Sequence, residues 1–201
     1  MLQSSAKNTA RLALIMSAAC FTMPALAHND TGHAVMSLAT GFTHPFSGLD
    51  HLLAMLAVGL WAAQQNRSAR WLWPLAFPLM MAAGALASLA GWHVPGVEAG
   101  IAGSVAVFGL LIAFAFRLPL WAGTVVVSLF AIVHGHAHGS ELPGGAAAGS
   151  YVIGFIAATV LLHLNGVAVG LAAREKTAAR AVRLAGAGIA AAGVYFLTVL
   201  G

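Results

Sequence analysis

Charged side chains are scarce in this sequence. Asp, Glu, Lys and Arg make up 7% of its 201 residues, whereas an ordinary soluble domain contains about 25%. Hydrophobic residues account for 60% and fall in long runs, as in an integral membrane protein. The net charge of +4 comes from basic residues scattered between these runs. Because they form no basic face, the pattern argues against binding to nucleic acid.

Cysteine is nearly absent, and the single one, Cys20, lies in a stretch that we interpret as a signal peptide. Residues 1–27 have a basic start, an apolar centre and the small-x-small pattern Ala25-Leu26-Ala27, after which signal peptidase would cut. The remaining domain, residues 28–201, would contain neither disulfides nor cysteine ligands for a metal. Two alternatives are an uncleaved membrane helix and a lipoprotein signal. The apolar centre is shorter than the ~20 residues of a span, and Ser17 stands where a lipoprotein signal has a large aliphatic residue.

Cleavage after Ala27 would place the sequence HNDTGH at the new N-terminus. The free α-amine and the imidazole of His28 can chelate one metal ion together, and Asp30 and His33 are close enough in sequence to help. This end of the chain is therefore a candidate for accessory metal capture. The alternative is a solvated leader without such a role, since short polar termini are usually disordered.

The apolar runs predict an all-α fold, a polytopic membrane bundle of about six transmembrane helices. The breaks between the runs are short and carry the Gly, Pro or charged residues that end a helix, as in QQNRSAR, GWHVPGV and GSELPGG. The predicted helices cover residues 44–63, 71–90, 98–116, 120–139, 147–172 and 181–200. The sequence does not decide whether this bundle forms a homo-oligomer.

The basic residues predict the orientation of the bundle in a bacterial inner membrane. If the signal peptide is removed, both ends of the mature chain lie in the periplasm. Every Lys and Arg of that chain then faces the cytoplasm, as the positive-inside rule requires: Arg67, Arg70, Arg117, Arg174, Lys176, Arg180 and Arg183. The opposite face carries the carboxylates and imidazoles of Asp30, Glu98, Glu141, His28, His33 and His93, a surface suited to collecting cations.

A first polar cluster stands at the start of the run HPFSGLDHLLAMLAVGLWAAQ. An Asp in the hydrocarbon costs about 2.5 to 3.5 kcal/mol on the insertion scale, so Asp50 needs a partner or a ligand. Pro45 favours a helix start, which puts His44 at the helix entrance. On a regular helix His44 and His51 share a face while Asp50 is rotated by about 100°. Either the helix is distorted near Pro45 and Gly48, or Asp50 orients an imidazole from behind.

A second polar cluster ends the predicted fourth helix, in VHGHAHGSELP. His134, His138 and Glu141 follow the spacing i, i+4, i+7, which places them on one stripe of a helix, and His136 points elsewhere. Pro143 predicts that the helix ends near Leu142, with Glu141 at the outer mouth. Both clusters then lie in the periplasmic half of the bundle.

Imidazole and carboxylate without thiolate suit Ni(II), Co(II), Zn(II) or Fe(II). A transported ion explains both clusters without a prosthetic group. An intramembrane zinc-dependent hydrolase, with three His ligands and a position left for water, is the principal alternative. A b-type cytochrome would need His pairs on facing helices at matched depth. For His163, in LLHLNG, the sequence leaves two roles open. It could form a hydrogen bond to a neighbouring helix, or it could lie on the ion path.

These motifs resemble those of the HupE/UreJ family of bacterial nickel and cobalt permeases. The likeness rests on HPFSGLDH and HGHAHGSE and extends over most of the chain through LPLWAG, PGVEAGIAGSV and LLHLNG. One departure is Val133, where the family usually has Phe. The resemblance implies a permease, not an enzyme, that imports Ni(II), or Co(II), and feeds hydrogenase or urease. It implies a metal site at His44, Asp50, His51, His134, His138 and Glu141.

Overall fold

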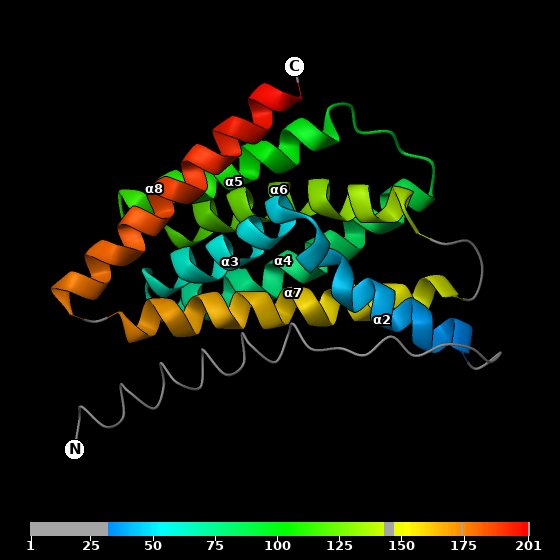
Figure 1. Cartoon of the computed structure of the whole chain (residues 1–201), viewed down its shortest axis with the longest axis horizontal. Helices are drawn as coiled ribbons and strands as arrows, with labels where there is room; N and C mark the ends of the chain where they lie inside the picture. Colours follow the sequence, from blue (N-terminus) through cyan, green and yellow to red (C-terminus); the bar gives the residue numbers. More distant parts are fainter. Residues whose placement is uncertain (1–31, 143–146, 174, 201) are drawn as a thin grey trace.

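The computed structural model describes residues 32–142, 147–173 and 175–200, with side chains from Ser37 onward except that of Ala147. In these residues the chain forms only helices and the turns between them (Figure 1). The helices are α2 (Gly32–Ser47), α3 (Leu49–Ala63), α4 (Arg67–Leu89), α5 (Val97–Ala113), α6 (Leu120–Ser140), α7 (Ala147–Ala172) and α8 (Lys176–Val199). The predicted signal peptide, His28, Asp30 and the side chain of His33 lie outside the described part.

The predicted fold class, a polytopic helical membrane protein, is confirmed. Four helices are long and apolar enough to cross a membrane: α4, α6, α7 and α8. The bent pair α2 and α3 adds a fifth if it counts as one span, and α5 is apolar but shorter, with 17 residues. Each of the predicted apolar runs therefore contains a helix, although not all of them reach the full length of a span.

The first predicted helix, residues 44–63, is wrong as a single element. The chain bends by 82° between α2 and α3, because Gly48 adopts an extended conformation (φ −100°, ψ 118°) at the break. Pro45 does not start a helix but lies inside α2, where it withdraws one amide hydrogen bond, and α2 ends two residues later. His44 is accordingly in the last turn of α2 rather than at a helix entrance.

Helix α3 is the centre of the bundle. It packs against α7, α5, α4 and α8, while α4 pairs with α6, α5 with α8, and α2 with α7. The α4–α6 pair is very close because a side chain on Gly135 would overlap the backbone carbonyl of Met81. Such small-residue contacts hold membrane helices together by dispersion. Here the contact aims the histidine-bearing end of α6 into the bundle, where His134 and His138 are buried.

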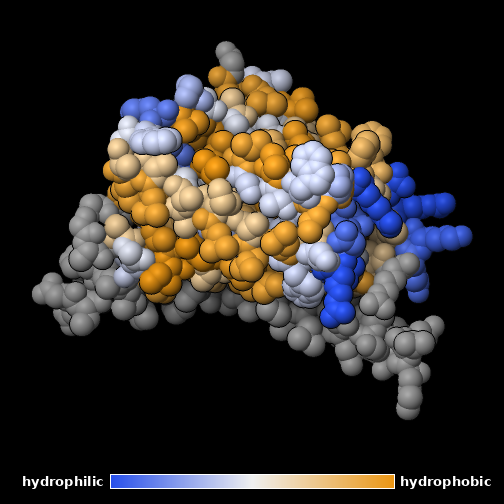
Figure 2. Space-filling view, turned by 180° about the vertical axis from the view of Figure 1, so that it is seen from behind, coloured by the Kyte–Doolittle hydropathy of each residue, from blue (hydrophilic) through white to orange (hydrophobic). Residues whose placement is uncertain are grey.

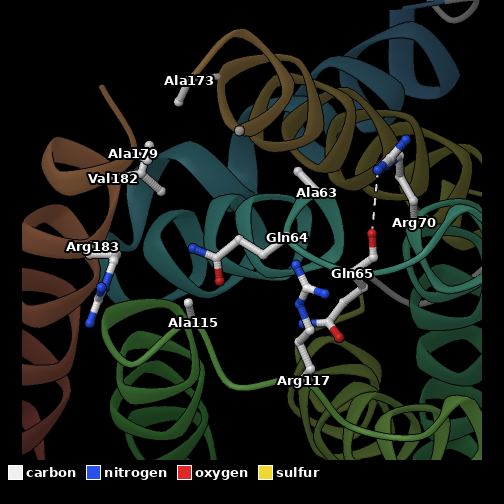
Figure 3. Close-up of a pocket in the computed structure, with 11 residues that line it drawn as sticks. Ala63, Gln64, Gln65, Arg70, Ala115, Arg117, Ala173, Ala179, Val182 and Arg183 are labelled. Atoms are coloured by element: carbon white, nitrogen blue, oxygen red, sulfur yellow. Dashed lines mark hydrogen bonds between the residues drawn. The ribbon is translucent and has the colours of Figure 1, made fainter. Parts of the chain in front are cut away.

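The two ends of the molecule differ in chemistry. Figure 2 shows a broad hydrophobic surface with the strongly hydrophilic residues gathered at the end where α7 stops and α8 begins. Arg70, Arg117 and Arg183 line one cavity there, of about 340 Å³ (Figure 3). Arg117 precedes α6 and Glu141 follows it, so these two residues lie at opposite ends of a helix of about 31 Å. The described Lys and Arg side chains thus gather at one end, while Glu141 lies at the other and Glu175, which precedes α8, is an acidic residue at the basic end.

Candidate metal centre

The bend at Gly48 brings the end of α2 and the start of α3 to the end of α6. His44 of α2 reaches Glu141, with 3.1 Å between Nε2 and a carboxylate oxygen. His138 joins them, and ligand atoms of His44, His138 and Glu141 all lie within 4.8 Å of one another. Two imidazoles and one carboxylate at this spacing are a donor set for a divalent transition metal.

His138 is the buried member of this group. Its ring stacks on Phe155 of α7 (centroids 4.8 Å, planes 25° apart) and meets the rings of His44 at 4.8 Å and His51 at 4.9 Å. Both of its ring nitrogens are buried without a hydrogen-bond partner. Leaving such groups unpaired in an apolar interior costs about 1 to 3 kcal/mol each, so His138 is a candidate ligand of a metal ion.

His51 is fixed by its neighbour in the chain. Its Nδ1 lies 2.9 Å from Oδ1 of Asp50, and the same oxygen accepts the backbone N–H of His51 at 2.7 Å. A carboxylate only accepts, so Nδ1 of His51 donates, and in the neutral ring the lone pair is on Nε2. That Nε2 is buried and unpaired. Asp50 therefore orients the imidazole through a hydrogen bond to Nδ1 and leaves Nε2 available. This is one of the two arrangements that the sequence left open.

His134 repeats this arrangement deeper in the bundle. Its Nδ1 donates to the backbone carbonyl of Phe130 at 2.9 Å, and its Nε2 is buried without a partner. The ring meets that of His51 at 5.3 Å. His51 and His134 thus carry unpaired Nε2 atoms next to the group of His44, His138 and Glu141, which is called the outer group below.

The members of the cluster differ in exposure. The exposed fraction of the side chain is 54% for Glu141, 26% for His44 and 13% for His51, and His134 and His138 are fully buried at 0%. Glu141 is thus the most exposed of these five side chains.

The structure gathers all six predicted site residues, but not as equals. His44, His138 and Glu141 form the three-ligand group, and Asp50, His51 and His134 lie beside it rather than in it. His136 points away, as predicted, and donates through Nε2 to the backbone carbonyl of Trp92 at 2.7 Å.

The sequence predicted that Glu98 lies on the outer face, but it did not place this residue near either polar cluster. It lines a cavity of about 290 Å³ together with Asp50 and Tyr195. Glu98 stands in the first turn of α5 and Asp50 in the first turn of α3, so their place on one cavity depends on how these two helices pack. A second acidic group thus stands beside the cluster.

Two tryptophans close the bundle toward the arginine-lined cavity. Trp61 stacks on Trp73 with centroids 4.3 Å apart, and both rings are fully buried. Trp61 and Gln65 each donate a hydrogen bond of 2.9 Å to the carbonyl of Phe116. Figure 3 shows Gln64 and Gln65 pointing into the cavity beside Arg117.

Comparison with known proteins decides the family. The profile described as "HupE / UreJ protein" matches residues 15–196. The chain belongs to the HupE/UreJ family. It is 44% identical over 180 residues to "Protein HupE" of Rhizobium leguminosarum bv. viciae, an alignment that covers 89% of this chain and 94% of that protein. No solved structure matches the chain significantly.

Membership in HupE/UreJ confirms the resemblance seen in the sequence. The family is one of nickel and cobalt transporters, so the chain is a multi-pass membrane protein of that broad class and not an enzyme. The alternative of an intramembrane zinc hydrolase therefore has no support.

Proposed function

We propose that this HupE/UreJ protein is a secondary permease that imports Ni(II), and Co(II) as a second substrate, across the bacterial inner membrane. The imported metal would supply the maturation of hydrogenase or urease. The observation that carries the proposal is the convergence of His44, His138 and Glu141 from two helices, with ligand atoms within 4.8 Å of one another.

The donor set favours these two metals over softer ones. Imidazole and carboxylate bind borderline divalent ions, and a group of two imidazoles and one carboxylate without a thiolate disfavours Cu(I). His51 and His134, with unpaired Nε2 atoms, are further ligands into which the ion can move. A transport site must bind strongly enough to admit the ion and weakly enough to release it, and adjacent partial sites achieve this.

The direction of transport is inferred from charge. Glu141 and the cavity lined by Asp50 and Glu98 lie on the imidazole side of the bundle. This side would face the periplasm, with both mature termini, and would concentrate cations. His28, Asp30 and His33 would add metal-capturing groups on the same side if the signal peptide is cut after Ala27.

The test is uptake of radiolabelled Ni(II) and Co(II) by cells that express the chain. We expect accumulation above that of cells without it, and a severe loss for His44→Ala, His138→Ala and Glu141→Ala at equal amounts of protein in the membrane. The matched control is Glu175→Gln, an exposed carboxylate that precedes α8 at the arginine end, which should transport normally. Uptake unchanged in both His138→Ala and Glu141→Ala would contradict the proposed site.

A further inference from the structure

His163 of α7 is completely buried and takes no part in the outer group. Its Nδ1 donates to the backbone carbonyl of Pro74 in α4 at 3.1 Å, which leaves the lone pair of the neutral ring on Nε2. That Nε2 is buried without a hydrogen-bond partner. His163 therefore has the same arrangement as His51 and His134: Nδ1 is anchored and Nε2 is available.

Thr159 stands one turn before His163 on the same face of α7. Thr159 is also completely buried, with an exposed fraction of 0%, and its hydroxyl has no hydrogen-bond partner. A helical Thr usually satisfies its hydroxyl by donating to the carbonyl three or four residues earlier, as Thr43, Thr124 and Thr198 do here. Two polar atoms left unpaired in the interior, on residues one helical turn apart, are a costly arrangement unless something binds them.

Phe77 connects this pair to the outer cluster. Its ring meets His134 at 5.5 Å and His163 at 5.1 Å, edge to face in both cases, and it is fully buried. The imidazoles therefore continue inward from His44 and His138 through His51 and His134, and beyond Phe77 to His163. His163 lies about two and a half turns before the end of α7 at the arginine side.

We propose that His163 and Thr159 form an inner binding station for the transported ion, reached from His134 past Phe77. His163 Nε2 and the Thr159 hydroxyl oxygen are its ligands, and Pro74 orients the imidazole through its carbonyl. This station deepens the proposed permease function and rests on it. The ion then crosses the bundle in two bound stages, and the Trp61–Trp73 stack is the last barrier before the arginine-lined cavity.

Thr159→Val is the decisive variant. Valine preserves the shape of threonine and removes only a hydroxyl that has no protein partner, so folding should be unaffected or improved. We expect uptake of radiolabelled Ni(II) to fall by roughly tenfold, as when a ligand of a metal site is lost, and Thr159→Ser to retain it. Ser104→Ala is the matched control, because Ser104 is equally buried but bonds the carbonyl of Ile101. It should transport like the parent.

His163→Leu provides the second test, together with equilibrium binding of Ni(II) to the purified full chain in nanodiscs. We expect uptake to be lost by roughly tenfold or more, while Ni(II) still binds to the outer group with unchanged affinity. Loss of outer binding together with uptake would show that His163 only supports the fold, and it would overturn the proposal. Normal uptake by Thr159→Val would overturn it as well. Failure of the parent chain to accumulate either metal would instead refute the permease function.

Discussion

Oδ1 of Asp50 accepts two hydrogen bonds from His51, from the ring Nδ1 at 2.9 Å and from the backbone amide at 2.7 Å. The carboxylate thereby fixes both the rotamer and the tautomer of the imidazole, and directs Nε2 toward His134 and His138. In the proposed metal site, Asp50 is therefore a positioning residue for His51.

Replacement of Asp50 by Asn should lower Ni(II) uptake by about 10- to 100-fold, the usual cost of losing such an orienting carboxylate. The amide is isosteric but neutral, so the protein should still reach the membrane in normal amounts. Initial uptake rates over a range of Ni(II) concentrations measure the effect. Normal rates in Asp50→Asn would mean that the carboxylate does not act through His51.

Gly48→Ala should impair transport without unfolding the bundle. A methyl group there would lie 2.8 Å from Oδ1 of Asp50 and 3.2 Å from Nδ1 of His51, which would push the pair out of its hydrogen bonds. We expect a loss of roughly tenfold in uptake with little change in the melting temperature of the purified protein. Gly103→Ala is the control, because a methyl group at Gly103 meets nothing within 4 Å.

His138 and His136 should differ sharply although they are two residues apart. His138→Ala removes two buried ring nitrogens that have no protein partner, so uptake should be severely reduced. His136→Ala removes the bond to the carbonyl of Trp92, at a cost of about 1 kcal/mol in stability, and an Nδ1 that is also buried without a partner. Because His136 is not in the group of His44, His138 and Glu141, this variant should transport nearly normally. Uptake assays normalised to membrane protein level compare the two. Equal losses would place His136 in the ion path.

A reporter fused after Gly201 should indicate a periplasmic C-terminus. The reason is the collection of basic residues at one end of the bundle, around the cavity of Arg70, Arg117 and Arg183, which the positive-inside rule assigns to the cytoplasm. Paired phosphatase and fluorescent-protein fusions measure the side. Activity on the cytoplasmic side would show that the N-terminal segment is retained or that the number of spans is odd.

Substitution of both His28 and His33 by Ala should reduce uptake when nickel is scarce and leave it nearly intact when nickel is abundant. Their proposed role is capture, in competition with protons, so the contribution should also weaken below neutral pH. Uptake at two nickel concentrations and two pH values tests this. Equal loss at both concentrations would assign these residues to the ion path or to folding instead.

The sequence by itself determined the class of the molecule. Helices and closed β-barrels can span a bilayer, and long continuous apolar runs lack the alternation of barrel strands, so they indicate helices. The spacing of His134, His138 and Glu141 along one helix is a local property that helical geometry fixes. The family motifs in HPFSGLDH and HGHAHGSE could likewise be found without a structure.

The tertiary structure decided how the two clusters meet. The spacing of His44 and His51 suited a continuous helix, but the 82° bend at Gly48 places them on different helices, where His44 reaches Glu141 and His51 reaches His134. A bend of this kind depends on what packs against both arms, here α7 beside α2 and α3, and such packing leaves no periodic signal.

His163 and Thr159 show the same limit. The sequence placed His163 in an apolar helix without deciding its role, because an imidazole bonded on both sides and one with a free nitrogen look identical in sequence. The distinction comes from contacts across helices: Pro74 occupies Nδ1, while no residue of the described bundle reaches Nε2 or the Thr159 hydroxyl. Hydrogen-bond satisfaction is a property of the packed interior, and only the packed interior reveals it.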